Sequence, residues 1–197
     1  MKLINKESDL RIWQSFRKGD KAAFQKIYFN HYRFLYNYCR KYTNDTSLVE
    51  DIIQDLFVTL LERKDFLSDT DNIRFYLFSS IRRRLFKTLN NREFKVTDLF
   101  SNDNPAFHLD QGVEPNFGND DEENRFQKLL ISSLNNLGER QKEMIYLKYY
   151  SGLNCKEIAD ILGVSYQTTR NTLSTALSNI RKDFEDEMPK GKMVIIS

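Results

Sequence analysis

The sequence is poor in residues that interrupt regular structure, because its 197 residues include only seven glycines and three prolines. It also lacks the alternation of polar and apolar residues that predicts β-strands. Apolar residues instead recur at helical spacing along most of the chain. Few turn residues and a helical period together predict an all-α fold.

Long apolar runs are absent as well. No stretch approaches the roughly 18 residues needed to span a bilayer, and the opening residues MKLINKESDLRIW lack the apolar segment of about 7–15 residues of a secretory signal. These absences favour a cytoplasmic location. The only two cysteines, Cys39 and Cys155, lie far apart inside helical patterns, so we expect reduced thiols rather than a disulfide.

The patterns of catalytic and metal sites are missing too. The two histidines, His31 and His108, are isolated, and there is no Gly-rich phosphate loop, nucleophile constellation or zinc-ligand spacing. We therefore expect no enzymatic activity, no metal and no cofactor. The rival hypothesis is a Mg²⁺-dependent nuclease built on Glu50, Asp51 and Asp55, but carboxylates on a helix are usually just solvated.

Positive charge is absent from one segment and concentrated in the segment before it. Residues 96–124 contain eight acidic residues and no Lys or Arg, whereas residues 82–95 contain six cations and one acid, Glu93. The net charge of +2 hides this asymmetry. The basic segment predicts a surface that faces a polyanion, and the acidic segment predicts a solvated, flexible tether.

These patterns divide the chain into two small helical domains joined by a flexible acidic linker. Residues 1–94 are predicted to form a four-helix domain, and residues 95–123 the linker. Residues 124–185 are predicted to form about four more helices, and residues 186–197 a frayed tail.

The third predicted helix of the first domain begins near DTSLVEDIIQDLF. Thr46 or Ser47 is its expected N-cap. Its apolar residues predict a broad buried stripe formed by Val49, Ile52, Ile53, Leu56, Phe57, Leu60 and Leu61.

EIADILGVSYQTTRNTLSTAL, which starts at Glu157, has the layout of a helix-turn-helix. Ala159 is small where the helices cross, Gly163 permits the turn, and Ser165 can cap the second helix. The apolar residues expected to hold the pair in place are Ile158, Leu162, Val164, Leu173 and Leu177. The residues expected to face outward, toward base edges and phosphates, are Tyr166, Gln167, Thr168, Arg170, Asn171 and Ser174.

An ordinary helix hairpin is the plainer interpretation of this segment, but the cap, the turn and the apolar pattern together favour DNA binding. The second helix has a single cation, Arg170, before Arg181. Phosphate contacts supply most of the affinity for duplex DNA, so this domain is expected to bind DNA weakly on its own.

Three stretches, in this order, resemble the extracytoplasmic-function (ECF) sigma factors of bacterial RNA polymerase. They are GDKAAFQKIYFNHYRFLYNYCRKYTND, VEDIIQDLFVTLLER and LNNLGERQKEMIYLKYYSGLNCKEIADILGVSYQTTRNTL. The resemblance implies a sigma factor that directs core RNA polymerase to specific promoters and initiates transcription. Residues 1–94 would be the region 2-like domain, which binds polymerase and opens the −10 element, and residues 124–185 the region 4-like domain, which reads the −35 element.

The resemblance also assigns roles to residues. Glu50, Asp51, Gln54 and Asp55 lie on or beside one helix face, and the family docks this face on the clamp helices of the largest polymerase subunit. Recognition and melting of the −10 element needs aromatic surfaces for an unstacked base and cations for the backbone. The implied residues are Asn72, Arg74, Phe75, Tyr76, Arg82, Arg83, Arg84 and Lys87, with residues 67–72 as a pocket-forming loop. Phe75 and Phe78 are equally compatible with the core.

The implied partners are core RNA polymerase, promoter DNA and, as is common in the family, an anti-sigma factor. The weakly basic recognition helix then has an explanation, because two DNA-reading domains tethered on polymerase share the affinity. The alternative is a stand-alone helix-turn-helix regulator, which would bind its operator without polymerase in a gel shift.

Overall fold

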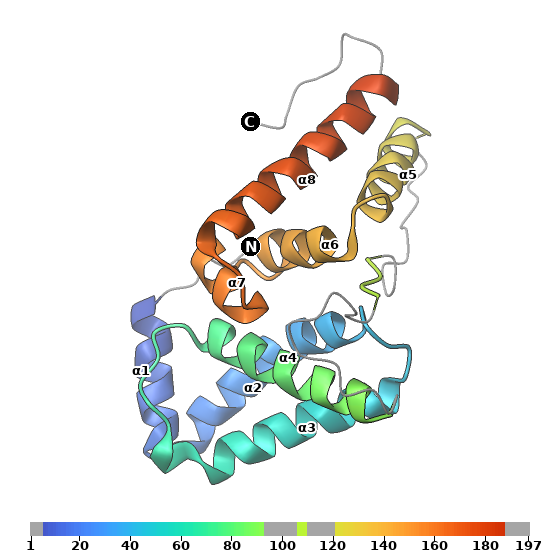
Figure 1. Cartoon of the computed structure of the whole chain (residues 1–197). Helices are drawn as coiled ribbons and strands as arrows, with labels where there is room; N and C mark the ends of the chain where they lie inside the picture. Colours follow the sequence, from blue (N-terminus) through green and yellow to red (C-terminus); the bar gives the residue numbers. More distant parts are fainter. Residues whose placement is uncertain (1–5, 93–105, 110–120, 188–197) are drawn as a thin grey trace.

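The computed structural model describes residues 6–92, 106–109 and 121–187, and every regular element in these ranges is helical (Figure 1). The first domain contains α1 (Lys6–Arg17), α2 (Lys21–Cys39), α3 (Thr46–Glu62), the short 3-10 helix η1 (Lys64–Phe66) and α4 (Ile73–Arg92). The second contains α5 (Asp121–Asn135), α6 (Glu139–Ile145), the π-helical turn η2 (Tyr146–Tyr150), α7 (Cys155–Leu162) and α8 (Tyr166–Glu187). The predicted all-α fold with two helical domains is confirmed.

The first domain is a four-helix unit around an aromatic-rich core. Gly19 has a φ of 91°, a conformation that suits glycine, and this residue ends the turn after α1. Asp20 then caps α2 by accepting hydrogen bonds from the backbone N–H groups of Ala22 and Ala23. The largest side chains in the core, which include Trp13, are almost completely buried.

Helix α3 differs from the sequence prediction in its N-cap residue and in the extent of its buried stripe. Its N-cap is Asp45, whose carboxylate accepts a hydrogen bond of 2.9 Å from the N–H of Leu48, and neither Thr46 nor Ser47 has this role. The predicted apolar stripe is buried except at Leu61, which is 42% exposed. The inward face of α3 is therefore narrower than the apolar pattern indicated.

The second domain is held together by α6, α7 and α8. Its fully buried residues include Met144, Leu147, Ile158 and Ala176. The residues that the sequence placed in the helix-turn-helix core are buried or half-buried with one exception: Leu177 is 39% exposed. It lies on the outer side of α8.

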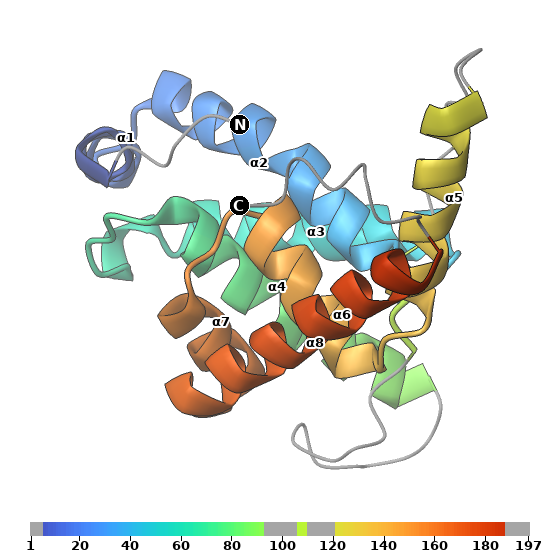
Figure 2. The same cartoon turned by 90° about the horizontal axis from the view of Figure 1, so that it is seen from above.

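The two domains pack directly against each other, with α7 lying against α4 (Figure 1). Seen from above, α1 and α5 lie at opposite ends of the molecule (Figure 2). The described part of the linker, residues 106–109, lies at the junction of the domains, and its Phe107 is only 1% exposed. This anchored segment was not predicted from the sequence. The rest of the linker from residue 95 to 105 and from 110 to 120, and the tail from residue 188, lie outside the described residues.

Two further findings concern the described ranges. No helix in them combines the length and apolar character needed to cross a bilayer. Cys39 and Cys155 are free thiols, which confirms the prediction of reduced cysteines. Burial raises the pKa of the Cys39 thiol, so this residue is an unreactive part of the core.

Candidate nucleic-acid interface

The helix-turn-helix has well-defined caps at both helix starts. Asn154 begins α7 in a capping box, because its side chain accepts from the N–H of Glu157 (3.0 Å) while the Glu157 carboxylate accepts from the N–H of Asn154 (2.9 Å). Gly163 adopts the left-handed conformation predicted for the turn, with φ of 65°. Ser165 then accepts a hydrogen bond of 2.9 Å from the N–H of Thr168, as predicted for the second helix. The chain thus fixes the direction of α8 by local hydrogen bonds.

The start of α8 presents a continuous polar surface. All six residues predicted to face outward are exposed: Tyr166, Gln167, Thr168, Arg170, Asn171 and Ser174. Gln167 donates to the side-chain oxygen of Asn171 (2.9 Å), which orients both amides. Thr169, by contrast, is fully buried, and its hydroxyl donates to the carbonyl of Ser165. Amide and guanidinium groups on an exposed helix face are the groups that read base edges in the major groove.

A second polar surface lies on α3. Glu50, Asp51, Gln54 and Asp55 are all exposed, as expected of a face that binds a partner. A shallow groove of about 300 Å³ runs beside them. Its lining combines Glu50 and Gln54 with the apolar side chains of Phe24, Tyr28, Tyr32, Phe57, Val58 and Leu61. Carboxylates at the edge of an aromatic groove suit a partner helix that carries both arginines and apolar residues.

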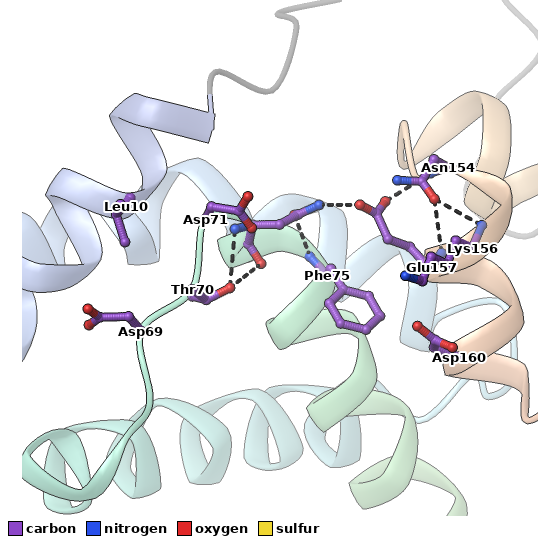
Figure 3. Close-up of a pocket in the computed structure, with 10 residues that line it drawn as sticks. Leu10, Asp69, Thr70, Asp71, Phe75, Asn154, Lys156, Glu157 and Asp160 are labelled. Carbon is purple, nitrogen blue, oxygen red and sulfur yellow. Dashed lines mark hydrogen bonds between the residues drawn. The ribbon is translucent and has the colours of Figure 1, made fainter.

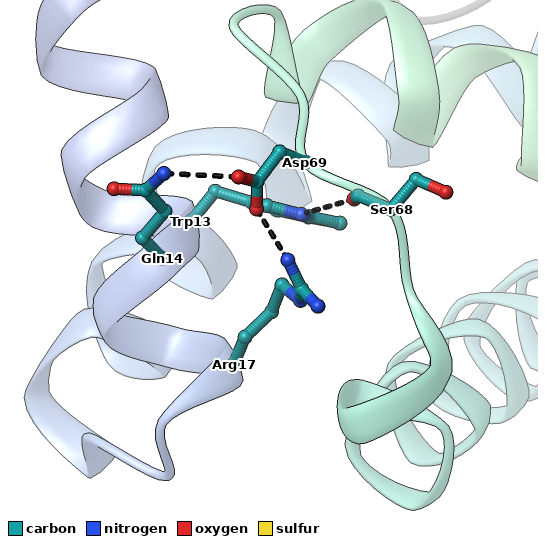
Figure 4. Close-up of polar contacts among 5 residues, drawn as sticks. All are labelled: Trp13, Gln14, Arg17, Ser68 and Asp69. Carbon is teal, nitrogen blue, oxygen red and sulfur yellow. Dashed lines mark hydrogen bonds and ion pairs between the residues drawn. The ribbon is translucent and has the colours of Figure 1, made fainter.

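The loop before α4 is fastened to α1 (Figure 4). The indole N–H of Trp13 donates to the carbonyl of Ser68 at 2.9 Å. Asp69 accepts a hydrogen bond from the amide of Gln14 at 3.0 Å and forms an ion pair with Arg17. These contacts hold the loop in one conformation. The loop that the sequence assigned to base binding is therefore built on a rigid support.

Asn72 directly precedes α4 and its side chain makes two hydrogen bonds. Its side-chain oxygen accepts from the N–H of Phe75 (2.9 Å), and its amide donates to the carboxylate of Glu157 on α7 (2.7 Å). The residue is only 5% exposed. Between this loop and α7 is a pocket of about 530 Å³ (Figure 3). Four carboxylates line it: Asp69, Asp71, Glu157 and Asp160.

The predicted aromatic and basic residues of α4 are divided between the surface and the domain junction. Arg83 and Lys87 are exposed and Arg84 is half-buried. Phe75 and Tyr76 are half-buried, and the Tyr76 ring packs edge-on against Trp13. Phe78 is a core residue at 1% exposure. The expectation that the arginines face outward fails for Arg82, which is 9% exposed, because the second domain covers it.

Arg82 belongs to a buried cluster that joins the domains. Its Nε lies 3.1 Å from the carboxylate of Glu143 on α6, and the hydroxyl of Tyr38 on α2 donates to the same carboxylate oxygen at 2.6 Å. Burial is the largest single effect and lowers the pKa of Arg82, but the charge of Glu143, together with Tyr38 and Tyr42, raises the pKa overall. Burial, followed by the charge of Glu143, raises the pKa of Tyr38. The cluster is therefore an ion pair with a neutral phenol.

Sequence reasoning missed Glu143 and Phe107. A weak signal for Glu143 exists, because this acid directly precedes the apolar run MIYL in a short helix. An acid inside an apolar helix face needs a buried partner. In the described part of the chain, no group of three or more His, Cys, Asp or Glu side chains is arranged to hold a metal ion.

Comparison with known proteins identifies both domains. Sigma-70 region 2 matches residues 27–93, and Sigma-70 region 4 matches residues 133–182. The ECF RNA polymerase sigma factor SigL of Mycobacterium tuberculosis is 24% identical over 171 residues, which cover 85% of this chain and 92% of that protein. The RNA polymerase sigma factor YlaC of Bacillus subtilis is 25% identical over 173 residues, with 83% and 92% covered.

Solved structures share the fold. CnrH in complex with the cytosolic domain of CnrY superposes with a TM-score of 0.56 at 17% identity, over 91% of this chain and 99% of that one. The sigma factor RpoE of Bartonella quintana, in complex with the anti-sigma factor NepR, gives a TM-score of 0.57 at 18% identity, over 84% and 98%.

The fold and the two matched regions define a promoter-recognition subunit of bacterial RNA polymerase. More narrowly, the chain belongs to the ECF sigma factors. Its function is to direct RNA polymerase to promoter DNA. RNA polymerase and promoter DNA are therefore its partners. Sigma factors recognise DNA and are not themselves enzymes.

Proposed function

We propose that this sigma factor divides its work among three surfaces. The exposed start of α8 reads the −35 element, the loop and first turns of α4 read and open the −10 element, and the acidic face of α3 binds core polymerase. The chain performs no covalent chemistry. Its contribution is tighter binding of melted than of duplex promoter DNA, which favours strand opening.

The observation that best supports this division is the exposure of the α3 face. Glu50, Asp51, Gln54 and Asp55 are all exposed beside a groove lined by aromatic rings. Apolar rings left at a groove are typical of a docking surface. The helices that surround the groove are rigidly packed, so the surface exists before the partner arrives.

The same proposal places the protein in the cytoplasm, where core polymerase and the chromosome are found. It also includes an anti-sigma factor as a partner. The structures of CnrH and of RpoE that resemble this chain are complexes with CnrY and with the anti-sigma factor NepR. A protein that masks the α3 face would keep this chain from polymerase.

The test of the α3 assignment is a charge reversal with a matched control. Asp55→Arg is expected to weaken binding to purified core polymerase at least about tenfold, because a cation replaces the partner of an arginine. Glu185→Arg, at the exposed end of α8, makes the same change of charge and is expected to bind like the wild type. Native gels and in-vitro transcription report the two effects. Equal binding by both variants would refute the assigned face.

A further inference from the structure

The second domain occupies the surface that the proposed function gives to −10 DNA. Arg74 donates to the carbonyl of Ser151 at 2.8 Å, and its guanidinium lies 4.5 Å from the ring centre of Phe34. The amide of Asn72 donates to the Glu157 carboxylate. Both acceptors belong to the second domain, and both are oxygen atoms of the kind that DNA would offer.

Arg82 is covered more completely. The carboxylate of Glu143, which is 4% exposed, contacts Arg82 in the space that a DNA phosphate would need. The guanidinium also lies over the ring of Phe86, 4.4 Å from its centre. An ion pair held in such a site is little screened by salt. At 9% exposure, Arg82 is not accessible to a nucleic acid in this arrangement.

The linker reinforces this contact. The Phe107 ring lies 5.0 Å from that of Tyr42 in the first domain and 5.6 Å from that of Tyr146 in the second. The Phe107 N–H donates to the carboxylate of Glu139 on α6. On the other side, the N–H of His108 donates to the carbonyl of Lys41 at 2.8 Å. Residues 106–109 are thus bonded to both domains.

We propose that this closed arrangement is an autoinhibited state of the free protein, in which Glu143 takes the place of DNA on Arg82 and Phe107 holds the domains together. Opening exposes Asn72, Arg74 and Arg82 at the same time. The inference rests on the proposed function, because it uses the DNA-binding role of these three residues. In this state Arg74 and Arg82 are unavailable to DNA, and the free protein binds DNA weakly until the domains separate.

The first test uses Glu143→Gln in the full chain. The amide can still accept from Tyr38, but it leaves Arg82 without a counter-charge in the closed state, and so favours the open state. The probe is a fluorescent single-stranded DNA pool of random sequence, without polymerase. Since apparent affinity scales with the fraction of open protein, the variant is expected to bind at least about tenfold more tightly than the wild type. Glu185→Gln has the same change of charge on an exposed site and is expected to bind like the wild type.

The second test measures the shape of the same proteins by small-angle X-ray scattering. A compact chain of this length has a radius of gyration of roughly 16 Å, and separated domains give a larger value. Glu143→Gln and Phe107→Ala are both expected to increase the radius, while circular dichroism shows unchanged helix content. Phe107→Ala adds no charge, so tighter DNA binding by this variant supports opening itself as the cause.

The outcomes separate the two proposals. If Glu143→Gln and Phe107→Ala match the wild type in radius and in DNA affinity, the autoinhibited state is refuted, even when the protein still supports transcription with core polymerase. If the variants open but bind DNA no better, the masking of the −10 surface is refuted. If no form of the protein supports transcription with core polymerase, the proposed function fails whatever the radius shows.

Discussion

The two candidate DNA-reading surfaces of this sigma factor differ in access. Every predicted base-reading residue on α8 is exposed, whereas Asn72 and Arg82 of the first domain are buried against the second domain. The surface on α8 is built by local caps and needs no neighbour. The surface on α4 includes side chains that also contact the second domain. Mutations of the buried residues Asn72 and Arg82 should therefore change stability, and mutations of the exposed residues on α8 should change DNA reading alone.

The largest expected effect comes from two phenylalanines on α4. Phe78 is 1% exposed and Phe75 is half-buried at the pocket. Phe78→Ala is expected to lower the free energy of unfolding by about 3–5 kcal/mol, because it leaves a cavity in the core. Phe75→Ala should cost clearly less and should instead weaken binding to single-stranded −10 DNA in the polymerase complex. Urea unfolding and fork-DNA binding measure the two effects, and equal destabilisation would contradict the distinction.

A pH dependence tests the same domain. Burial, and secondarily the charge of Arg74, lowers the pKa of His31 to about 4 from its ordinary 6.5. Between these values the unfolded chain binds a proton that the folded chain does not, so stability falls as pH falls through this window. The loss is up to about 3 kcal/mol. Urea unfolding at pH 7 and pH 4.5 measures it, and His31→Gln should flatten this part of the profile. An unchanged slope in the variant would show that carboxylates alone cause the loss.

On α8, the corresponding test compares two arginines. Arg170→Ala is expected to reduce transcription from a promoter with its native −35 element by roughly tenfold, because loss of a base or phosphate contact costs about 1–3 kcal/mol. Arg181 lies eleven residues further along the same helix. Arg181→Ala should have a smaller effect, equal on native and scrambled −35 DNA. Both variants should unfold like the wild type, and a preference for native DNA that survives in Arg170→Ala would refute its reading role.

The smallest expected effect concerns the cap of α8. Ser165→Ala removes the acceptor for the N–H of Thr168, at a cost of about 1 kcal/mol. Ser174→Ala, on the exposed face, should change stability by less than about 0.5 kcal/mol. Thermal unfolding of the two variants gives the comparison. A cap variant as stable as the wild type would show that packing alone fixes the start of the helix.

The sequence predicted local features well. Gly163 and Ser165 act as expected because caps and turns depend on a few neighbouring residues. The α3 cap was assigned one or two residues too late, since Asp, Thr and Ser at positions 45–47 are all good caps and only the backbone decides among them. Leu61 and Leu177 look like core residues in a helical pattern but lie at the edge of their stripes.

Contacts between distant segments could not be predicted in the same way. Arg82 and Arg83 are neighbours in one basic run, yet α6 contacts Arg82 while Arg83 stays exposed. Phe107 lies in a stretch rich in Asn, Asp and Pro whose composition indicates solvent exposure. Its burial depends on a space formed by Tyr42 and Tyr146, which only the folded pair of domains creates.

The position of Phe107 makes separation of the two domains cooperative. Since one ring touches both aromatic clusters, it cannot leave one of them and keep all its contacts with the other. A molecule that binds residues 106–109 would thus separate the two domains in a single step. Partly separated states would be sparsely populated. The conversion would resemble a switch with two positions rather than a gradual loosening.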